Sequence, residues 1–451
     1  MADRGRHGRA GRGVLGGLRQ HPARPGRAPL PAAGGRLHPR RPDQRLRHHP
    51  GRVRGGSGGE RGHHPGQRLG RRAVGVPHPD HFCHGGAGPA LPTLGSRRPL
   101  YPREVAPVDL TPLVVSFVTF FGIYLILALS MNLEYGLTGL PNFGKVFFYS
   151  VGAYTSAFVV SRLMLALGGA SLVPWSAEAA VFREELARSE PWLAIGLFLL
   201  CLVLAALVGA ALGSLLSSPA LRVQDVYLAL ILLVVAEIAR VYVRATEGFI
   251  GGPHGLGGIP NPFRFIEGAG PRGLAYAGLV LALAAGAYVL VERITHSPFG
   301  RLMKAVRDDE LAAQVLGKRT HWVKAQVMAV GSALAAVAGV LYAFFTEFVG
   351  TEDFDSQLTF TVLLMVILGG AGNHRGVVAG TLIMTAIDRF TRPSFLALLG
   401  LQLPVDINYA RHALIGVLLV LLILYRPQGL APEGRVRTAA REEVRHLGVS
   451  S

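Results

Sequence analysis

The segment Ser297–Lys324 reads SPFGRLMKAVRDDELAAQVLGKRTHWVK and separates long apolar runs on either side. Ser297 followed by Pro298 is typical of a helix start, because a hydroxyl side chain caps free N–H groups and proline fits the first turn. Apolar side chains then recur at helical spacing, at Phe299, Leu302, Met303 and Val306. The segment is therefore predicted to begin with a helix that has one apolar face.

A second short helix is expected over Leu311–Leu316, because the acidic cluster Asp308–Glu310 suits a helix N-terminus and Gly317 suits a helix end. Basic residues occur throughout this region, at Arg293, Arg301, Lys304, Arg307, Lys318, Arg319 and Lys324. Positive charge close to membrane spans is typical of cytoplasmic loops. We therefore expect the helix pair in the cytoplasm, where its apolar face can meet a soluble partner.

The surrounding apolar runs have the length of membrane-spanning helices, which need about 20 residues. The expected spans are Thr111–Asn132, Val146–Leu167, Trp192–Leu216, Val226–Val243, Leu274–Val291, Val327–Phe345, Thr359–Leu368, Gly376–Phe390 and Tyr409–Tyr425. Backbone groups in lipid must be hydrogen-bonded within the protein. The predicted fold is therefore all-α, a polytopic membrane bundle of about eight or nine helices.

The arginine-rich tail after Tyr425 is also predicted to be cytoplasmic. Four predicted spans separate this tail from the Ser297–Lys324 loop. Because four is an even number, the tail and the loop fall on the same side of the membrane. Counting back along the chain, Gly168–Glu190 and Ala245–Gly273 fall on the outer side. We divide the chain into a tail over 1–104, a transmembrane domain over 105–431 and a cytoplasmic tail over 432–451.

Residues 1–104 differ sharply in composition from the rest. The first hundred residues contain 20 Arg, 22 Gly, 13 Pro, 4 acidic residues and no Lys, so they hold most of the net charge of +18. This charge does not argue that the folded part binds nucleic acid. The tail is expected to be disordered. It is interpreted as a basic segment that contacts anionic lipid or nucleic acid, as a solvated tail, or as a misread frame outside the native protein.

Three glycine-rich stretches lie near the ends of predicted spans, at Leu137–Gly152, Gly248–Pro262 and Leu368–Gly380. The first indicates a broken segment lining a substrate path, with tight helix packing as the alternative. The second excludes helix and indicates a gate or docking edge, with a plain connector as the alternative. The third repeats the pattern of the first. The path or gate residues are Gly139, Pro141, Asn142, Gly144, Gly251, Gly252, Gly255, Gly257, Gly258, Gly369, Gly370 and Gly372.

The sequence carries no pattern of catalytic residues, metal ligands or phosphate-binding glycines that we recognise. Cys83 and Cys201 are too few for a disulfide framework. His374 is predicted to be exposed and alone, rather than a metal ligand. Apart from Glu134 and Glu237, the spans are nearly free of acidic groups, and Glu237 is expected to pair with Arg240.

Taken together, several stretches resemble the permease subunits of branched-chain amino acid ABC transporters, the leucine/isoleucine/valine type. They are ALSMNLEYGLTGLPNFGKVFFYSVGAYTSA at 128–157, GGPHGLGGIP at 251–260, GRLMKAVRDDELAAQVLG at 300–317, MVILGGAGNHRGVVAG at 365–380 and LYRPQGLAPEGR at 424–435. Two features depart from the family. A further span usually precedes the one at Thr111–Asn132, and Lys145 stands where the family commonly has histidine.

The resemblance implies a permease without cofactors that leaves ATP to its partner subunits. These partners would be a second related permease, two cytoplasmic ATP-binding subunits and an extracytoplasmic substrate-binding protein. The protein would lie in the lipid of a bacterial or archaeal plasma membrane, with a cytoplasmic C-terminus. The loop would couple to the ATPase through Arg301, Glu310, Ala312, Ala313 and Gly317, of which the last four occupy the family's places.

Three other functions are weighed against this one. A urea or short-amide permease of the same family is poorly separated by sequence. A secondary transporter driven by protons or Na⁺ would need acidic groups or histidines at mid-membrane, which are scarce here. A structural subunit without transport is disfavoured by the glycine-broken spans.

Overall fold

The structure is a computed structural model that describes residues 110–217 and 225–392, and parts of 413–433. In the last range, the described residues are 413, 415–417, 420–421, 424–426 and 428–433. The predictions for the tail 1–104, for much of the span Tyr409–Tyr425 and for most of the tail 432–451 therefore lie outside the described residues.

Six helices in the described part are long and apolar enough to cross a membrane. They are α1 (Thr111–Met131, continued by a π-helical turn η1, Asn132–Gly136), α2 (Lys145–Leu167), α4 (Pro191–Ser217), α5 (Asp225–Ala245), α7 (Ala269–His296) and α10 (Thr320–Thr346). Two further helices, α11 (Gln357–Gly369) and α12 (His374–Phe390), have 13 and 17 residues. The all-α membrane bundle is confirmed, whereas the total of eight or nine spans stays a prediction.

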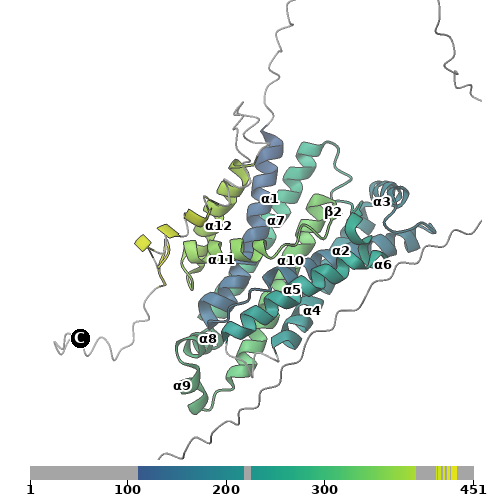
Figure 1. Ribbon diagram of the computed structural model, residues 1–451. Coiled ribbons are helices and arrows are strands. Elements are labelled where there is room, and N and C mark those ends of the chain that lie inside the picture. The colour runs from purple at the N-terminus through teal and green to yellow at the C-terminus, as the bar shows by residue number, and fades with distance from the viewer. Residues whose placement is uncertain are drawn as a thin grey trace, which may run out of the picture. The chain divides into compact units, whose positions relative to one another are not determined.

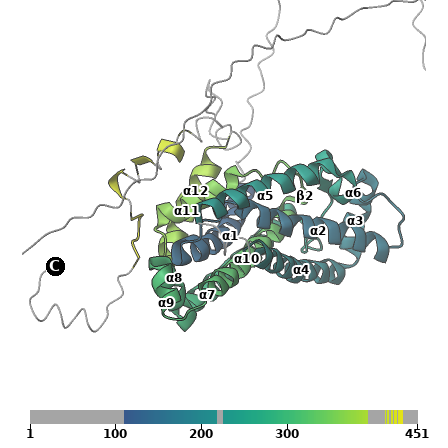
Figure 2. The same ribbon diagram turned by 60° about the horizontal axis from the view of Figure 1, so that its bottom comes forward.

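The core of the bundle is built around α1 and α10, which lie centrally in Figure 2. Two thirds of the most apolar window of each helix is buried, against about a third for α4, α5 and α7. Helix α10 packs on α4 and α2, and α1 packs on α7, α10 and α12. The exposed apolar side chains of the outer helices are the surface that lipid or a partner subunit would cover.

One end of the bundle carries a small cap, seen at the right of Figures 1 and 2. It consists of α3 (Ala177–Ser189), α6 (Glu247–Ile250), a 3₁₀ turn η3 (Gly252–His254) and the strands β1 (Leu256–Gly257) and β2 (Phe348–Val349), which pair antiparallel. The prediction that glycines exclude helix here is wrong. The glycines at positive φ end the short helical turns instead of preventing them.

The opposite end carries α8 (Pro298–Asp308) and α9 (Glu310–Val315). The predicted helix starts are confirmed by their caps. Ser297 Oγ accepts a hydrogen bond from Gly300 N–H at 3.3 Å, and Asp309 Oδ1 accepts one from Ala312 N–H at 2.9 Å. We call this end of the molecule the α8 end and the opposite one the cap end.

Candidate functional site

The first glycine-rich stretch is a genuine break between α1 and α2. The chain leaves helical conformation at Gly139 and re-enters helix at Lys145. Asn142 is buried within the break and its Oδ1 accepts a hydrogen bond from Gly144 N–H at 3.1 Å. Pro141 is half-buried and suits a backbone that cannot continue as helix. The predicted broken segment is therefore present, at the α8 end of the bundle.

A buried ion pair holds the two sides of this break together. Lys145 Nζ lies 2.7 Å from Glu134 Oε2, and the two side chains are 1% and 0% exposed. Asn142 Nδ2 donates to the same carboxylate oxygen at 2.9 Å. A Cβ at Gly331 would lie 2.0 Å from the other oxygen, so only glycine on α10 leaves room for this carboxylate. Lys145, at the position where the family commonly has histidine, thus acts as the counter-charge of Glu134.

The third glycine-rich stretch lies against the π-helical end of α1, just before the first stretch, although about 240 residues separate the contacting residues. Asn132 Oδ1 accepts a hydrogen bond from Gly372 N–H at 2.8 Å, and Asn132 Nδ2 lies 3.0 Å from His374 Nδ1. His374 Nε2 lies 2.8 Å from Thr295 Oγ1 of α7. His374 is 5% exposed, so the prediction of an exposed histidine is wrong. Its ring links α1, α7 and α12, which leaves neither nitrogen free for a metal.

Close backbone contacts explain the remaining glycines of this stretch. A Cβ at Gly369 would lie 2.3 Å from Gly376 O, so α11 and α12 meet at van der Waals distance there. A Cβ at Gly370 would meet Ala431 O at 2.3 Å, where the C-terminal segment crosses. These glycines permit close packing between segments, and a role of this stretch in a substrate path stays a prediction.

The glycine loop at the cap end is fixed by one arginine of α3. Arg183 donates to Gly258 O at 2.9 Å, to Gly257 O at 2.7 Å and to Pro174 O at 2.8 Å, and its side chain is fully buried. Burial lowers the pKa of Arg183 to about 10, so the guanidinium stays charged at neutral pH. The loop is therefore an ordered part of the cap. The predicted gate residues Gly251, Gly252, Gly255, Gly257 and Gly258 all lie in it.

The acidic groups expected in the spans are both ion-paired. Glu237 pairs with Arg240, whose Nη2 lies 2.9 Å from Glu237 Oε2, and it also accepts a hydrogen bond from Ser356. The predicted Glu237–Arg240 pair is confirmed. Arg240 and Arg244 reach Glu352, which follows β2. Both Glu134 and Glu237 therefore hold segments together, a structural role that needs no coupling ion.

The predicted coupling residues divide between surface and core. Arg301, Ala312 and Gly317 are exposed, Glu310 is half-buried, and Ala313 is buried within the protein itself. Glu310 Oε2 lies 2.7 Å from Lys324 Nζ, which fixes α9 to the start of α10. Ala313 therefore packs α9 on its own chain, and no finding yet tests the docking role of the other four.

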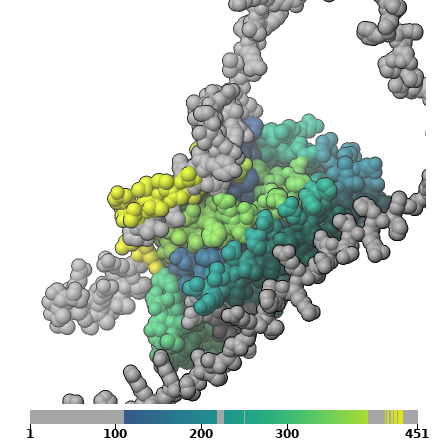
Figure 3. Space-filling model, in the orientation of Figure 1, coloured from purple at the N-terminus to yellow at the C-terminus, as the bar shows by residue number. Residues whose placement is uncertain are grey.

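Helix α9 presents an apolar surface that the sequence interpretation did not single out. Leu311, Val315 and Leu316 are 73%, 88% and 77% exposed. Together with Ala312 they form what we call the α9 face. Figure 1 places it at the tip of the α8 end, and Figure 3 shows that tip projecting from the molecule. The helical spacing of these residues was visible in the sequence, but their outward direction depends on how α9 packs.

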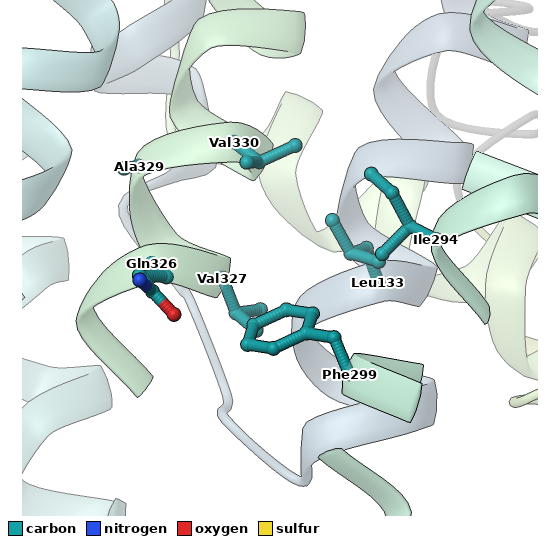
Figure 4. Close-up of a pocket in the computed structure, with 7 residues that line it drawn as sticks. All are labelled: Leu133, Ile294, Phe299, Gln326, Val327, Ala329 and Val330. Atoms are coloured by element: carbon teal, nitrogen blue, oxygen red, sulfur yellow. The ribbon is translucent and has the colours of Figure 1, made fainter. Parts of the chain in front are cut away.

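An apolar pocket of about 380 Å³ lies beside the start of α8. Figure 4 shows Phe299 of α8 pointing toward Val327 of α10, with Leu133 and Ile294 across the space. Its other lining residues are Gln326, Ala329 and Val330. The Phe299 side chain in the first turn of α8 therefore borders the pocket.

Metal binding finds no support in residues 110–217, 225–392 and the described positions after 412. They contain no group of three or more histidine, cysteine or acidic side chains that could hold an ion. The site at the α8 end is thus defined by two non-helical breaks, a buried ion pair and the α9 face. The first break covers residues 139–144 between α1 and α2, and the second covers residues 370–373 between α11 and α12.

Comparisons with known proteins agree with this arrangement. The family model described as branched-chain amino acid transport system / permease component matches residues 113–423. A probable branched-chain amino acid transport permease protein LivM of Methanocaldococcus jannaschii is 32% identical over 333 residues, which are 72% of this chain and 95% of that protein. No solved structure gives a significant match.

Two further relatives are high-affinity branched-chain amino acid transport system permease proteins. LivM of Escherichia coli K12 is 29% identical over 343 residues, covering 71% of this chain and 70% of that protein. LivH of Salmonella typhimurium is 23% identical over 326 residues, covering 69% and 92%. With its six long apolar helices, the chain is a multi-pass membrane protein that belongs to the family of permease components of branched-chain amino acid transport systems.

Proposed function

We propose that this chain is the transmembrane permease subunit of an ATP-driven importer of branched-chain amino acids. The observation that carries the proposal is the α9 face, an exposed apolar surface on a helix pair at the end where the two glycine-rich breaks meet. Such an exposed apolar surface suits the docking of a soluble partner. Helix α9 can transmit force from that partner, because the Lys324–Glu310 pair anchors it to α10. ATP hydrolysis belongs to that partner, and the permease itself uses no cofactor.

The complete complex would contain a second related permease, two cytoplasmic ATP-binding subunits and an extracytoplasmic substrate-binding protein. The α8 end then faces the cytoplasm together with the C-terminus, and the cap end faces the binding protein. Two features support this orientation. Basic residues are concentrated around α8 and α9, and Glu433 after the last described helical residues lies against α8. ATP hydrolysis would favour one of two access states through contacts that differ between them.

The α9 face gives a direct test. Ala312 is exposed, so Ala312→Glu places a charge on the docking surface without disturbing a membrane span. We expect the variant to reach the membrane, while binding-protein-stimulated ATP hydrolysis and uptake both fall at least about tenfold, because an unpaired buried charge costs several kcal/mol. Ala312→Ser, which keeps the side chain at this position small and uncharged, is the matched control. Assembly and transport at the unmodified rate would rule out α9 as the ATPase contact.

The substrate is tested separately. The relatives are named as branched-chain amino acid permeases, and the buried residues of the described spans are mostly apolar, which suits aliphatic side chains. We expect uptake of labelled leucine, isoleucine and valine to depend on this protein. Uptake of urea that leucine does not inhibit would instead favour the urea or short-amide alternative. Uptake that follows a proton gradient without any ATPase would favour a secondary transporter.

A further inference from the structure

Arg307, in the last turn of α8, connects this helix to the first backbone break. Its Nη1 donates to Gly136 O at 2.7 Å, at the end of the π-helical turn of α1. The same nitrogen donates to Glu433 Oε2 at 2.8 Å. Lys304, one turn earlier on α8, places its Nζ 2.7 Å from Glu433 Oε1. One carboxylate therefore holds two cations of α8, and one of them also holds the α1–α2 break.

Glycines on both breaks leave the space that this pair occupies. A Cβ at Gly139 would lie 3.2 Å from Arg307 Cγ. A Cβ at Gly372 would lie 2.9 Å from Glu433 Oε2, and this residue also has φ of +86°. The pair is thus seated between the first and the second break, and any side chain at Gly372 would push the carboxylate away from α8.

Glu433 is itself fixed to the second break. Its segment forms backbone hydrogen bonds with the end of α11, from Leu430 N–H to Leu368 O at 2.8 Å and from Ala431 N–H to Gly369 O at 3.0 Å. Asn373 Nδ2 also donates to Pro432 O at 3.1 Å. The Glu433 carboxylate is therefore fixed to α11 and α12. A displacement of Arg307 would move both the first and the second break.

The two ends of α8 are held differently. Its last turn is fixed by the Arg307 and Lys304 contacts, whereas Phe299 in its first turn borders the apolar pocket of about 380 Å³ (Figure 4). Movement of α8 would therefore act on the breaks through its last turn, where the charged contacts lie. Hydrogen bonds between charged groups are the stronger kind, so they suit the anchored end.

We propose that Arg307 and Glu433 form a joint that transmits displacement of α8 to both glycine-rich breaks, with Glu433 as a positioning residue for transport. This inference rests on the proposed docking of an ATPase on α9. The joint links the docking surface to the two places where the backbone of the bundle is not helical. Loss of the Arg307–Glu433 contact leaves docking of the ATPase intact. It removes the connection between that docking and the substrate path.

The first test uses the complex reconstituted in proteoliposomes with its ATP-binding subunits and binding protein. Glu433→Gln keeps the side-chain shape but removes the charge that holds Lys304 and Arg307. We expect ATP hydrolysis within about twofold of the unmodified complex and uptake reduced about tenfold, so more ATP is used for each substrate. An unchanged ratio of ATP to substrate overturns the proposal. Absence of ATP-dependent uptake by the unmodified complex overturns the proposed function instead.

The second test needs the permease alone, so it does not depend on assembly. Hydrogen–deuterium exchange is measured over residues 136–144, where Gly139 N–H and Leu140 N–H bond to Tyr135 O and Glu134 O. In Glu433→Gln and in Arg307→Met we expect exchange about tenfold faster there, and no change over the cap residues 251–258. Lys318→Met is the matched control and should exchange like the unmodified protein, because Lys318 is exposed after α9 and lies outside the joint. Equal exchange in all four proteins overturns the proposal.

Discussion

The two ends of the molecule use glycine in different ways. At the cap end, one glycine loop packs between α3 and β2, and a single arginine of α3 holds its carbonyl groups. At the α8 end, two breaks from distant parts of the sequence meet, and side chains from α1, α8 and the C-terminal segment join them. Glycine therefore marks a loop that contacts its neighbours in the cap at one end, and a junction of several helices at the other.

This contrast predicts how many segments are loosened when a single contact is lost. A lost contact at the cap end should loosen one loop, because its partners are neighbours in the same cap. A lost contact at the α8 end should disturb several helices, because the contact joins them. Charge sharpens the difference, since the ion pair at the α1–α2 break is fully buried, whereas Arg264 at the cap pairs with the half-buried or exposed Glu184 and Glu347.

The largest effect is expected when the buried pair at the α8 end is broken. Lys145→Met leaves the Glu134 carboxylate buried without its counter-charge, and we expect the free energy of unfolding to fall by about 3–5 kcal/mol. The double variant Lys145→Met/Glu134→Gln should recover most of this loss, because it removes both charges. The measurement is thermal and denaturant unfolding of the purified protein in detergent.

Lys318→Met serves as the control for this prediction, since Lys318 is exposed after α9. It should unfold like the unmodified protein. If Lys145→Met also unfolded like the unmodified protein, the pair would not hold the break. If the double variant were as unstable as the single one, shape and not charge would be the cause.

An intermediate effect is expected at the cap end. Arg183→Met removes three hydrogen bonds to carbonyl groups of half-buried residues, so we expect a loss of about 3 kcal/mol. Arg188→Met on the same helix is the control, because Arg188 is 56% exposed and its pair with Glu184 contributes less than about 1 kcal/mol.

The comparison between the ends is checked by hydrogen–deuterium exchange in Arg183→Met. Faster exchange should be confined to the cap residues 251–258, while residues 136–144 keep the exchange of the unmodified protein. Faster exchange in both regions would show that the cap is not self-contained.

The smallest effect concerns acid. Burial raises the pKa of the Glu433 carboxyl, but hydrogen bonds and charge from Lys304 and Arg307 outweigh it, so this pKa lies below its usual value. A carboxyl with a lowered pKa in the folded state contributes stability that is present above its unfolded pKa of about 4.3. That stability is lost as the pH falls through the folded pKa. The difference in unfolding temperature between the unmodified protein and Glu433→Gln should therefore be full at pH 7, begin to shrink near pH 4, and vanish only below the lowered pKa of the folded state.

The cap provides the opposite case. Burial is the main cause that raises the pKa of Glu347, although Arg264 opposes it. A raised pKa means that protonation of the Glu347 carboxyl favours the folded state. Lowering the pH therefore removes the cost of burying its negative charge. Glu347→Gln should not lower the unfolding temperature at pH 7 as Glu433→Gln does. Equal pH profiles for the two variants would contradict the assigned directions.

Much of the fold was predictable because lipid imposes a simple rule. Apolar runs of sufficient length must be helical, and the six long helices coincide with predicted spans. The caps of α8 and α9 were also predictable, since Ser297 and Asp309 act on N–H groups within three residues. The cap was harder to predict, because α3 and the β1–β2 pair depend on contacts between distant segments.

The candidate site was predicted only as separate parts. The sequence placed the glycine breaks and the α8–α9 loop, and the resemblance supplied their shared purpose. It did not show that His374 is buried, that Ala313 faces its own chain or that Leu311, Val315 and Leu316 point outward. Those directions follow from which face of a short helix packs on its neighbours, and a helix of six residues carries little pattern to reveal this.

By itself, the sequence determined the membrane class, the main helices and the helix ends, because these depend on local hydrogen bonding and on burial in lipid. Only the tertiary structure decided which charges pair. Lys145 with Glu134 is close in sequence, but Arg307 with Glu433 spans 126 residues. A pairing of that kind depends on where α11 and the C-terminal segment pack, and close packing at Gly370 and Gly372 sets that position.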